Sequence, residues 1–262
     1  MPPTFVLTIY AAVVGLMVGS YLNVVIYRLP RGISTVLPRS RCPRCGSPIG
    51  AADNLPVLSY LLLRGRCRAC GALISPVYPL VEMATAALFV TCLRRFGLTA
   101  AAPAAALFCC LMIVLAAIDV EHLILPDRIT LPGMVAGLAL QPWLPWGGLR
   151  SAAAGVVVGG GVLLAVWGTW YLVRREEGMG LGDVKMLALI GAFLGWKGAL
   201  VALFFAALSG ALTGLALMWG RGVGMKAKLP FGAFLALGGL VALFVGRDIA
   251  DWYARLLVGG NG

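Results

Sequence analysis

The chain has 262 residues, of which 61% are hydrophobic and 12% are charged, and its formal net charge is +11. This composition excludes an ordinary water-soluble domain and predicts an integral membrane protein. A basic charge balance can indicate nucleic-acid binding. Here, basic residues gathered on one side of membrane-spanning segments explain the charge better, so we expect no nucleic-acid partner. Residues 1–4 carry no basic charge, so we expect no cleavable signal peptide.

The chain contains eight apolar segments. A helix that spans a bilayer needs about 20 apolar residues. The segments predict an all-α polytopic membrane protein with about eight transmembrane helices in a lipid bilayer. The apolar segments are 5–26, 77–93, 100–118, 129–140, 151–173, 186–194, 199–219 and 229–245. We therefore divide the chain into a first transmembrane helix (1–27), a polar domain (28–76) and a helical core (77–262).

Residues 28–76 hold eight arginines but a single acid, Asp53. Two Cys-x-x-Cys pairs lie within this segment, 21 residues apart, and each is followed by glycine: Cys42, Cys45, Cys67 and Cys70. Such pairs predict a tetrahedral four-thiolate zinc site. Two disulfides are the alternative, but the arginines place the loop in the reducing cytosol. Four thiolates leave no open coordination position, so we expect the zinc to be structural.

Two acids lie next to apolar segments, where a carboxylate is costly and indicates function. Asp119 directly ends one apolar run, and Asp183 follows glycines at 178, 180 and 182 and precedes another run. The glycines let the backbone approach another group closely. Two carboxylates on separate helices at one membrane depth can share a proton and activate water, which is the chemistry of aspartyl proteases.

Other polar residues have simpler interpretations. We expect Asn23 to bond a neighbouring helix, and Glu82 to pair with an arginine of the preceding loop rather than act in catalysis. Glu121, His122 and Asp127 are interpreted as residues of a turn between helices. No His or Cys accompanies His122 at ligand spacing, so no metal is expected there.

The distribution of basic residues predicts the orientation of the chain in the membrane. With eight spans and the N-terminus outside, the basic residues on the outer side are Arg94, Arg95, Arg150, Lys197, Arg247 and Arg255, and all others are inside. The excess of positive charge inside favours this topology. It also places Asp119 and Asp183 at the cytosolic ends of their helices.

Along nearly its whole length the chain resembles the bacterial type IV prepilin peptidases, also called leader peptidase/N-methyltransferases. The resemblance is carried by both cysteine pairs and by the segments 19–30, 53–60, 78–82, 118–119, 125–127, 180–185 and 230–232. The signature Gly180-Leu181-Gly182-Asp183 is similar to the Gly-x-Gly-Asp signature of presenilin-type intramembrane proteases. One position departs from the family: Ala233 stands where proline is common. Because Ala233 lies far in sequence from both acids, we expect this departure to cast little doubt on the peptidase assignment.

The resemblance implies that Asp119 and Asp183 are the catalytic pair of a bacterial inner-membrane enzyme. Its substrates would be type IV prepilins and the pseudopilins of type II secretion, cleaved after a glycine at the cytosolic face. Members with the four-cysteine loop typically also methylate the new amino terminus, using S-adenosylmethionine. The resemblance assigns no residues to methyl transfer and no oligomeric state.

Two other functions are compatible with parts of the sequence. An ion pathway or transporter with a structural zinc loop would also carry acids in the membrane. A protein that acts only in assembly, with zinc holding its loop together, would need no catalysis. Neither accounts as economically for a Gly-x-Gly-Asp sequence combined with a second inner-face aspartate.

Overall fold

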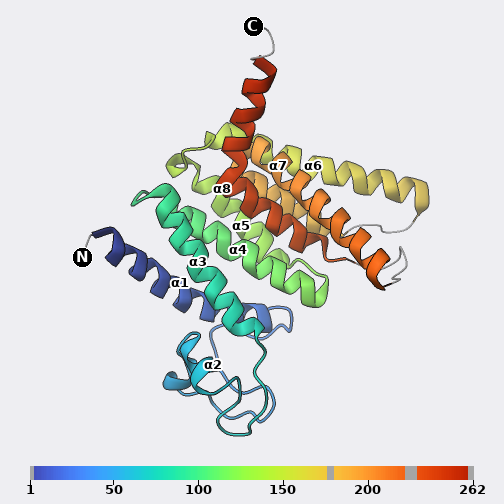
Figure 1. Ribbon diagram of the computed structural model, residues 1–262. Coiled ribbons are helices and arrows are strands. Elements are labelled where there is room, and N and C mark those ends of the chain that lie inside the picture. The colour runs from blue at the N-terminus through green and yellow to red at the C-terminus, as the bar shows by residue number, and fades with distance from the viewer. Residues whose placement is uncertain (1–2, 176–179, 222–228, 259–262) are drawn as a thin grey trace. The chain divides into compact units, whose positions relative to one another are not determined.

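The computed structural model describes residues 3–175, 180–221 and 229–258, and it is built from helices and connecting loops (Figure 1). The α-helices are α1 (Pro3–Arg28), α2 (Leu58–Leu62), α3 (Val77–Phe96), α4 (Ala101–His122), α5 (Asp127–Ala139), α6 (Gly148–Arg174), α7 (Leu181–Arg221) and α8 (Phe231–Val258). Two short 3₁₀ helices are η1 (Ala51–Asn54) and η2 (Gln141–Trp143). Among the described residues no strand forms, which confirms the all-α class.

Five of these helices are long and apolar enough to cross a membrane: α1, α3, α4, α6 and α7. A shorter apolar stretch, Phe231–Gly246, lies in α8. All eight apolar segments of the sequence fall within helices or their immediate ends. The segments 186–194 and 199–219 share α7, and α5, with 13 residues, is shorter than a span.

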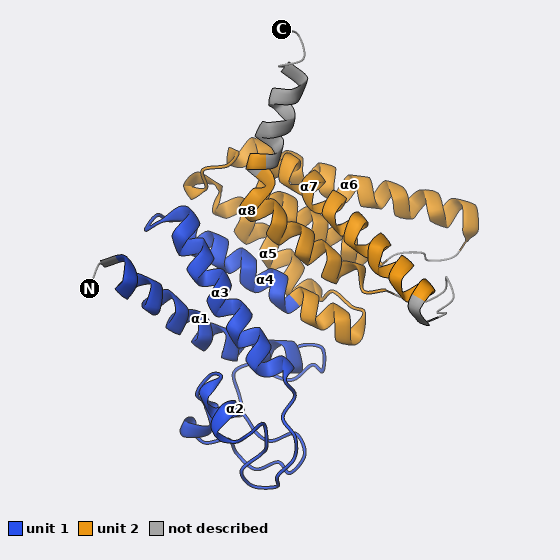
Figure 2. Ribbon diagram, in the orientation of Figure 1, with its two compact units in different colours: residues 1–114 blue, residues 115–262 orange. Residues whose placement is uncertain are grey.

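The chain forms two compact units, residues 1–114 and 115–262, whose boundary falls within α4 (Figure 2). In the first unit α1 packs closely on α3, because Gly15 presents no side chain. A Cβ at Gly15 would lie 2.6 Å from the Cα of Ala86. The Asn23 side-chain amide donates to the Tyr78 carbonyl at 3.0 Å, which confirms the expected bond to a neighbouring helix.

Glu82 is buried within the first unit, with 7% of its surface exposed. Its Oε2 accepts the backbone N–H of Val57 at 2.7 Å. The predicted arginine partner is therefore wrong, although the pairing is with the preceding loop. Val57 precedes the first residue of α2, where backbone N–H groups lack helical partners and a carboxylate can accept from them.

In the second unit the two parts of α7 have different neighbours. Gly191, in the first part, lies directly against Gly155 of α6. Ala202, in the second part, lies against Gly238 of α8. Small residues at these crossings let the helix backbones approach, as is common between membrane helices.

The two parts of α7 meet at Gly195, whose φ of 72° and ψ of 178° are not helical. A break in a helix leaves carbonyls without their N–H partners, and these must be satisfied inside a membrane protein. The Gln141 side chain donates to the carbonyl of Ala192 at 2.7 Å and to that of Phe193 at 3.1 Å. The Trp146 indole also donates to Phe193, at 2.8 Å.

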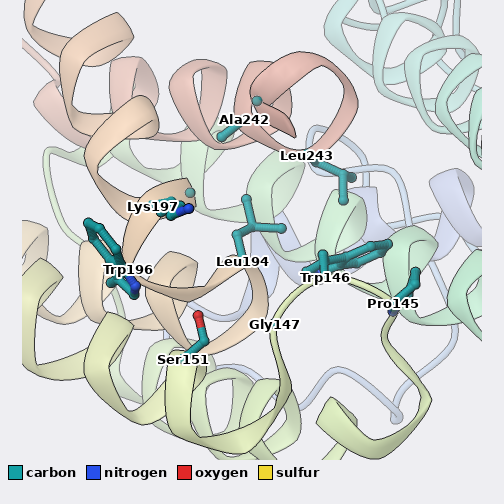
Figure 3. A pocket seen from close by; sticks show the side chains of 11 residues that line it. Pro145, Trp146, Gly147, Ser151, Leu194, Trp196, Lys197, Ala242 and Leu243 are labelled. Carbon is teal, nitrogen blue, oxygen red and sulfur yellow. The ribbon is translucent and has the colours of Figure 1, made fainter. Parts of the chain in front are cut away.

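A pocket of about 310 Å³ lies beside this break, lined by residues of the α5–α6 connection, α6, α7 and α8 (Figure 3). Its lining includes Trp146, Ser151, Lys197 and Leu243. Asp183 lies 12 residues before Gly195, which corresponds to about 18 Å along a helix. The pocket is therefore remote from Asp183, and neither Asp119 nor Asp183 lines it.

The α6–α7 crossing gives a test of the packing. Gly155→Ala would place a Cβ against the backbone of Gly191, which cannot move aside like a flexible side chain. We expect a loss of about 1–3 kcal/mol, seen as a fall of several degrees in the Tm of the purified protein. Gly161→Ala in the same helix is the control, since a Cβ there meets nothing within 4 Å. Equal Tm values for both variants would contradict the proposed crossing.

Candidate functional site

Asp119 lies in the last turn of α4, which continues to His122. The preceding residues Leu115 and Ile118 are fully buried, and they carry Asp119 into the interior, where 5% of its surface is exposed. The helix stops before Leu123, which adopts a positive φ of 55°, and Pro126 follows. The aspartate is thus part of the helix rather than of the turn beyond it.

Asp183 is the third residue of α7 and is also buried, with 8% exposed. Its backbone N–H donates to the carbonyl of Gly180, just before the helix begins, at 3.2 Å. Acidic side chains are favourable in a first helical turn, because the N–H groups there lack helical partners. Beyond it, Met186, Leu187 and Ile190 are fully buried and anchor this end of α7.

Leu125 packs against Gly182, the residue before Asp183, and against Gly232, which lies against Asp119, so the two aspartates flank one side chain. A Cβ at Gly182 would lie 2.9 Å from the Leu125 Cβ. A Cβ at Gly232, in the first turn of α8, would lie 2.9 Å from Asp119 Oδ2. The close approach expected at Gly182 is therefore present, whereas Gly178 lies outside the described residues.

The remaining acids of this region are less buried. Glu121 Oε1 lies 3.6 Å from His122 Nε2 at the end of α4. Asp127, which begins α5, forms an ion pair with Lys185 of α7, at 2.7 Å from Oδ1 and 2.8 Å from Oδ2. Sequence reasoning missed this pair, which ties α5 to α7 two residues after Asp183. Among the described acidic side chains of the second unit, only Asp119 and Asp183 are buried.

The four cysteines of the loop gather in the first unit. Their Sγ atoms all lie within 4.8 Å of one another, and those of Cys42 and Cys70 are 3.9 Å apart. Four thiolates about 2.3 Å from a tetrahedral metal ion would be about 3.8 Å apart. The cluster therefore has the dimensions to hold a metal ion.

Each Cys-x-x-Cys pair is closed by the same turn. The N–H of Gly46 donates to the Cys42 carbonyl, and that of Gly71 to the Cys67 carbonyl, both at 2.9 Å. Both glycines have positive φ, 72° and 69°, a region that side chains disfavour. This explains why a glycine follows each pair.

Hydrogen bonds favour the thiolate form of two of these cysteines. The Ser47 side chain and backbone lower the pKa of Cys45 to about 6. The backbone N–H groups of Cys70 and Ala69 lower the pKa of Cys67. Metal ligation requires the thiolate form, which these bonds favour.

The Cys70 thiol behaves differently. The Ala72 N–H lowers its pKa, but partial desolvation and the neighbouring thiols outweigh that effect and raise the pKa to about 11. A cation at the centre of the cluster would reverse the rise in the pKa of Cys70.

Arg68 forms a bidentate ion pair with Asp53, with a shortest N···O distance of 2.7 Å. This ion pair lowers the pKa of Asp53.

Comparison with known proteins places these features in a family. Residues 13–96 match the bacterial peptidase A24 N-terminal domain. Residues 106–215, which include both buried aspartates, match the type IV leader peptidase family. The chain belongs to this family.

Curated relatives agree over most of the chain. A prepilin leader peptidase/N-methyltransferase of Pseudomonas putida is 40% identical over 98% of this chain and 96% of the relative. Its counterpart in Burkholderia pseudomallei is 39% identical over 98% of this chain and 90% of the relative. One from Myxococcus xanthus is 45% identical over 82% of this chain and 64% of the relative. No solved structure matches the chain.

One contact of the site was missed from the sequence. The backbone N–H of Ala233 donates to Asp119 Oδ2 at 3.1 Å, across 114 positions of sequence. The expectation that Ala233 leaves the peptidase assignment intact is confirmed by the family match. Its distance from both acids in sequence nevertheless hides a direct contact with one of them.

Proposed function

We propose that this protein cleaves the leader peptides of type IV prepilins and pseudopilins after a glycine, using Asp119 and Asp183 as its catalytic pair. The observation that carries the proposal is that two buried carboxylates flank the same side chain, Leu125, in a chain of the type IV leader peptidase family. The relatives that share most of the chain are named as prepilin leader peptidases. The transporter interpretation has no such support.

The chemistry follows from what two neighbouring carboxylates can do. The ionised member takes a proton from water, and the resulting nucleophile attacks the scissile carbonyl carbon. The protonated member donates its proton to the carbonyl oxygen. Because like charges in a buried site repel each other, one proton shared by the pair is the favourable state. Burial beside the bilayer also suits a substrate with a polar leader and an apolar helix.

The catalytic pair is tested by removing each carboxylate. Asp119→Asn and Asp183→Asn should each abolish leader removal, because neither residue alone supplies both base and acid. The double variant should be no worse than either single variant, since groups that act as a unit are not additive. The measurement is conversion of a purified prepilin, followed by mass spectrometry at matched enzyme levels.

Glu121→Gln is the matched control for this experiment, as it neutralises an exposed acid in the same helical turn of α4. It should retain most of the activity. Full cleavage by Asp183→Asn would remove the two-aspartate mechanism altogether. Loss of activity in Glu121→Gln, with Asp119→Asn active, would show that the wrong acid of α4 was chosen.

We also propose that the protein methylates the amino terminus that cleavage exposes, as the names of its relatives describe. The methyl group passes from the sulfonium of S-adenosylmethionine to the neutral amine, which then releases a proton. The products are the N-methylated pilin and S-adenosylhomocysteine.

Adding S-adenosylmethionine should therefore shift the mass of the cleaved pilin by one methyl group, while leader removal should proceed without it. A matched reaction with S-adenosylhomocysteine in place of the donor controls for nonspecific effects. Cleaved pilin that stays unmethylated in excess donor would restrict the function to that of a peptidase.

We assign the four-cysteine cluster as a structural zinc site. Four thiolates at tetrahedral spacing suit this ion, and they leave no coordination position for a substrate. Asp53 and Arg68 join the segment of η1 to the second cysteine pair. The ion would tie the two pairs together and order the loop.

Protein purified without added metal should contain about one zinc per chain by elemental analysis. Cys42→Ser should lower that content and make residues 28–76 more sensitive to limited proteolysis, because structural zinc supplies folding energy. Cys110→Ser, a cysteine outside the cluster, is the control and should keep its zinc. Freely alkylated thiols at all four positions in the native, metal-free protein would overturn the assignment.

We place the N-terminus on the outer side of the inner membrane and the two aspartates at the cytosolic face. The excess of basic residues in the loop 28–76 supports this orientation. A membrane-impermeant thiol reagent should miss a cysteine introduced at exposed Ser34 in intact cells and label it in inverted vesicles. Labelling from outside in intact cells would reverse the topology.

A further inference from the structure

Two helix ends of opposite polarity meet at Asp119. Its own helix, α4, ends there, and the partial negative charge of a helix C-terminus disfavours an anion. The first turn of α8 faces it with backbone N–H groups. The N–H of Ala233 lies 3.1 Å from Asp119 Oδ2 and 3.2 Å from the Pro230 carbonyl, so one donor serves both acceptors.

The approach of the carboxylate to α8 depends on Gly232. A Cβ at this position would lie 2.9 Å from Asp119 Oδ2, too close for an undisturbed contact. The Gly232 backbone thus lies directly against the carboxylate. Asp119 accepts a backbone N–H from another helix, α8, whereas Asp183 lies in the first turn of its own helix, α7.

We propose that the Ala233 amide is a positioning group that fixes Asp119 and stabilises it as the ionised member of the pair. Asp119 then accepts the proton from water, and Asp183 donates a proton to the scissile carbonyl. The inference rests on the proposed peptidase function. A hydrogen bond to a carboxylate outweighs the dipole of a helix end, so the Ala233 donor decides where the charge resides.

The other charged groups around the pair do not produce this bias. Asp183 is the coupled partner itself, and Asp127 and Lys185 neutralise each other on an exposed face. Glu121 and His122 lie in contact with each other at the end of α4. The first turn of α8, residues 231–233, carries no titratable side chain. The Ala233 amide of α8 remains as the asymmetric feature among the described groups.

Ala233→Pro tests the role of the amide, because proline removes the N–H and is tolerated in the first turn of a helix. In the full-length enzyme, the acidic limb of the pH profile of kcat/KM should move upward by about one pH unit. That shift is about a tenfold loss of kcat/KM on the acidic side. The basic limb should stay in place. Ala233→Ser keeps the N–H, so its acidic limb should remain at the wild-type pH.

The limb that moves reports which aspartate carries the charge, since the acidic limb reflects the base and the basic limb the acid. Movement of the basic limb alone would make Asp119 the acid and overturn the assignment. An unchanged profile, with Asp119→Asn inactive, would refute the role of Ala233 and leave the proposed function intact. An active Asp119→Asn would refute the proposed function itself. Should Ala233→Pro not fold, Gly232→Ala, which displaces the carboxylate from the same amide, should shift the same limb.

Discussion

Burying two carboxylates beside each other is the constraint around which the second unit is arranged. An acid near the membrane interior is unfavourable by roughly 2–4 kcal/mol, and a second one adds repulsion. The chain reduces this cost by its helix starts: Asp119 accepts the Ala233 N–H of the first turn of α8, and Asp183 lies in the first turn of α7. Leu125 fits between these ends only because Gly182 and Gly232 have no side chains.

The absence of water imposes a related demand further along α7. A backbone break inside a membrane protein exposes carbonyls that no solvent can satisfy. Near Gly195, the side chains of Gln141 and Trp146, from another segment, donate hydrogen bonds to the freed carbonyls. The same segment of α7 lies on α6 through the Gly155–Gly191 contact. Rigid packing along 181–195 thus anchors the helix whose first turn carries Asp183.

Sequence patterns predicted what depends on local composition. Apolar runs became helices, the Cys-x-x-Cys pairs converged, and Asp119 and Asp183 are each buried at a helix end next to an apolar run. Contacts between distant segments could not be obtained in this way. Neither hydropathy nor spacing pairs Glu82 with the Val57 amide, Asp127 with Lys185, or Ala233 with Asp119, since each depends on how helices dock. Of these, the Ala233 contact bears most directly on the proposed chemistry.

The Ala233 contact shows how a single backbone donor can bias a pair of carboxylates. Alanine at this position supplies a hydrogen bond that reaches Asp119 Oδ2 directly. A proline there would keep the turn but remove the N–H, so Asp119 would be left with its own helix end, which disfavours charge. Such a change would alter the electrostatics of the aspartate pair without changing any titratable group, and its effect is therefore expected in the pH dependence of cleavage rather than in the identity of the substrate.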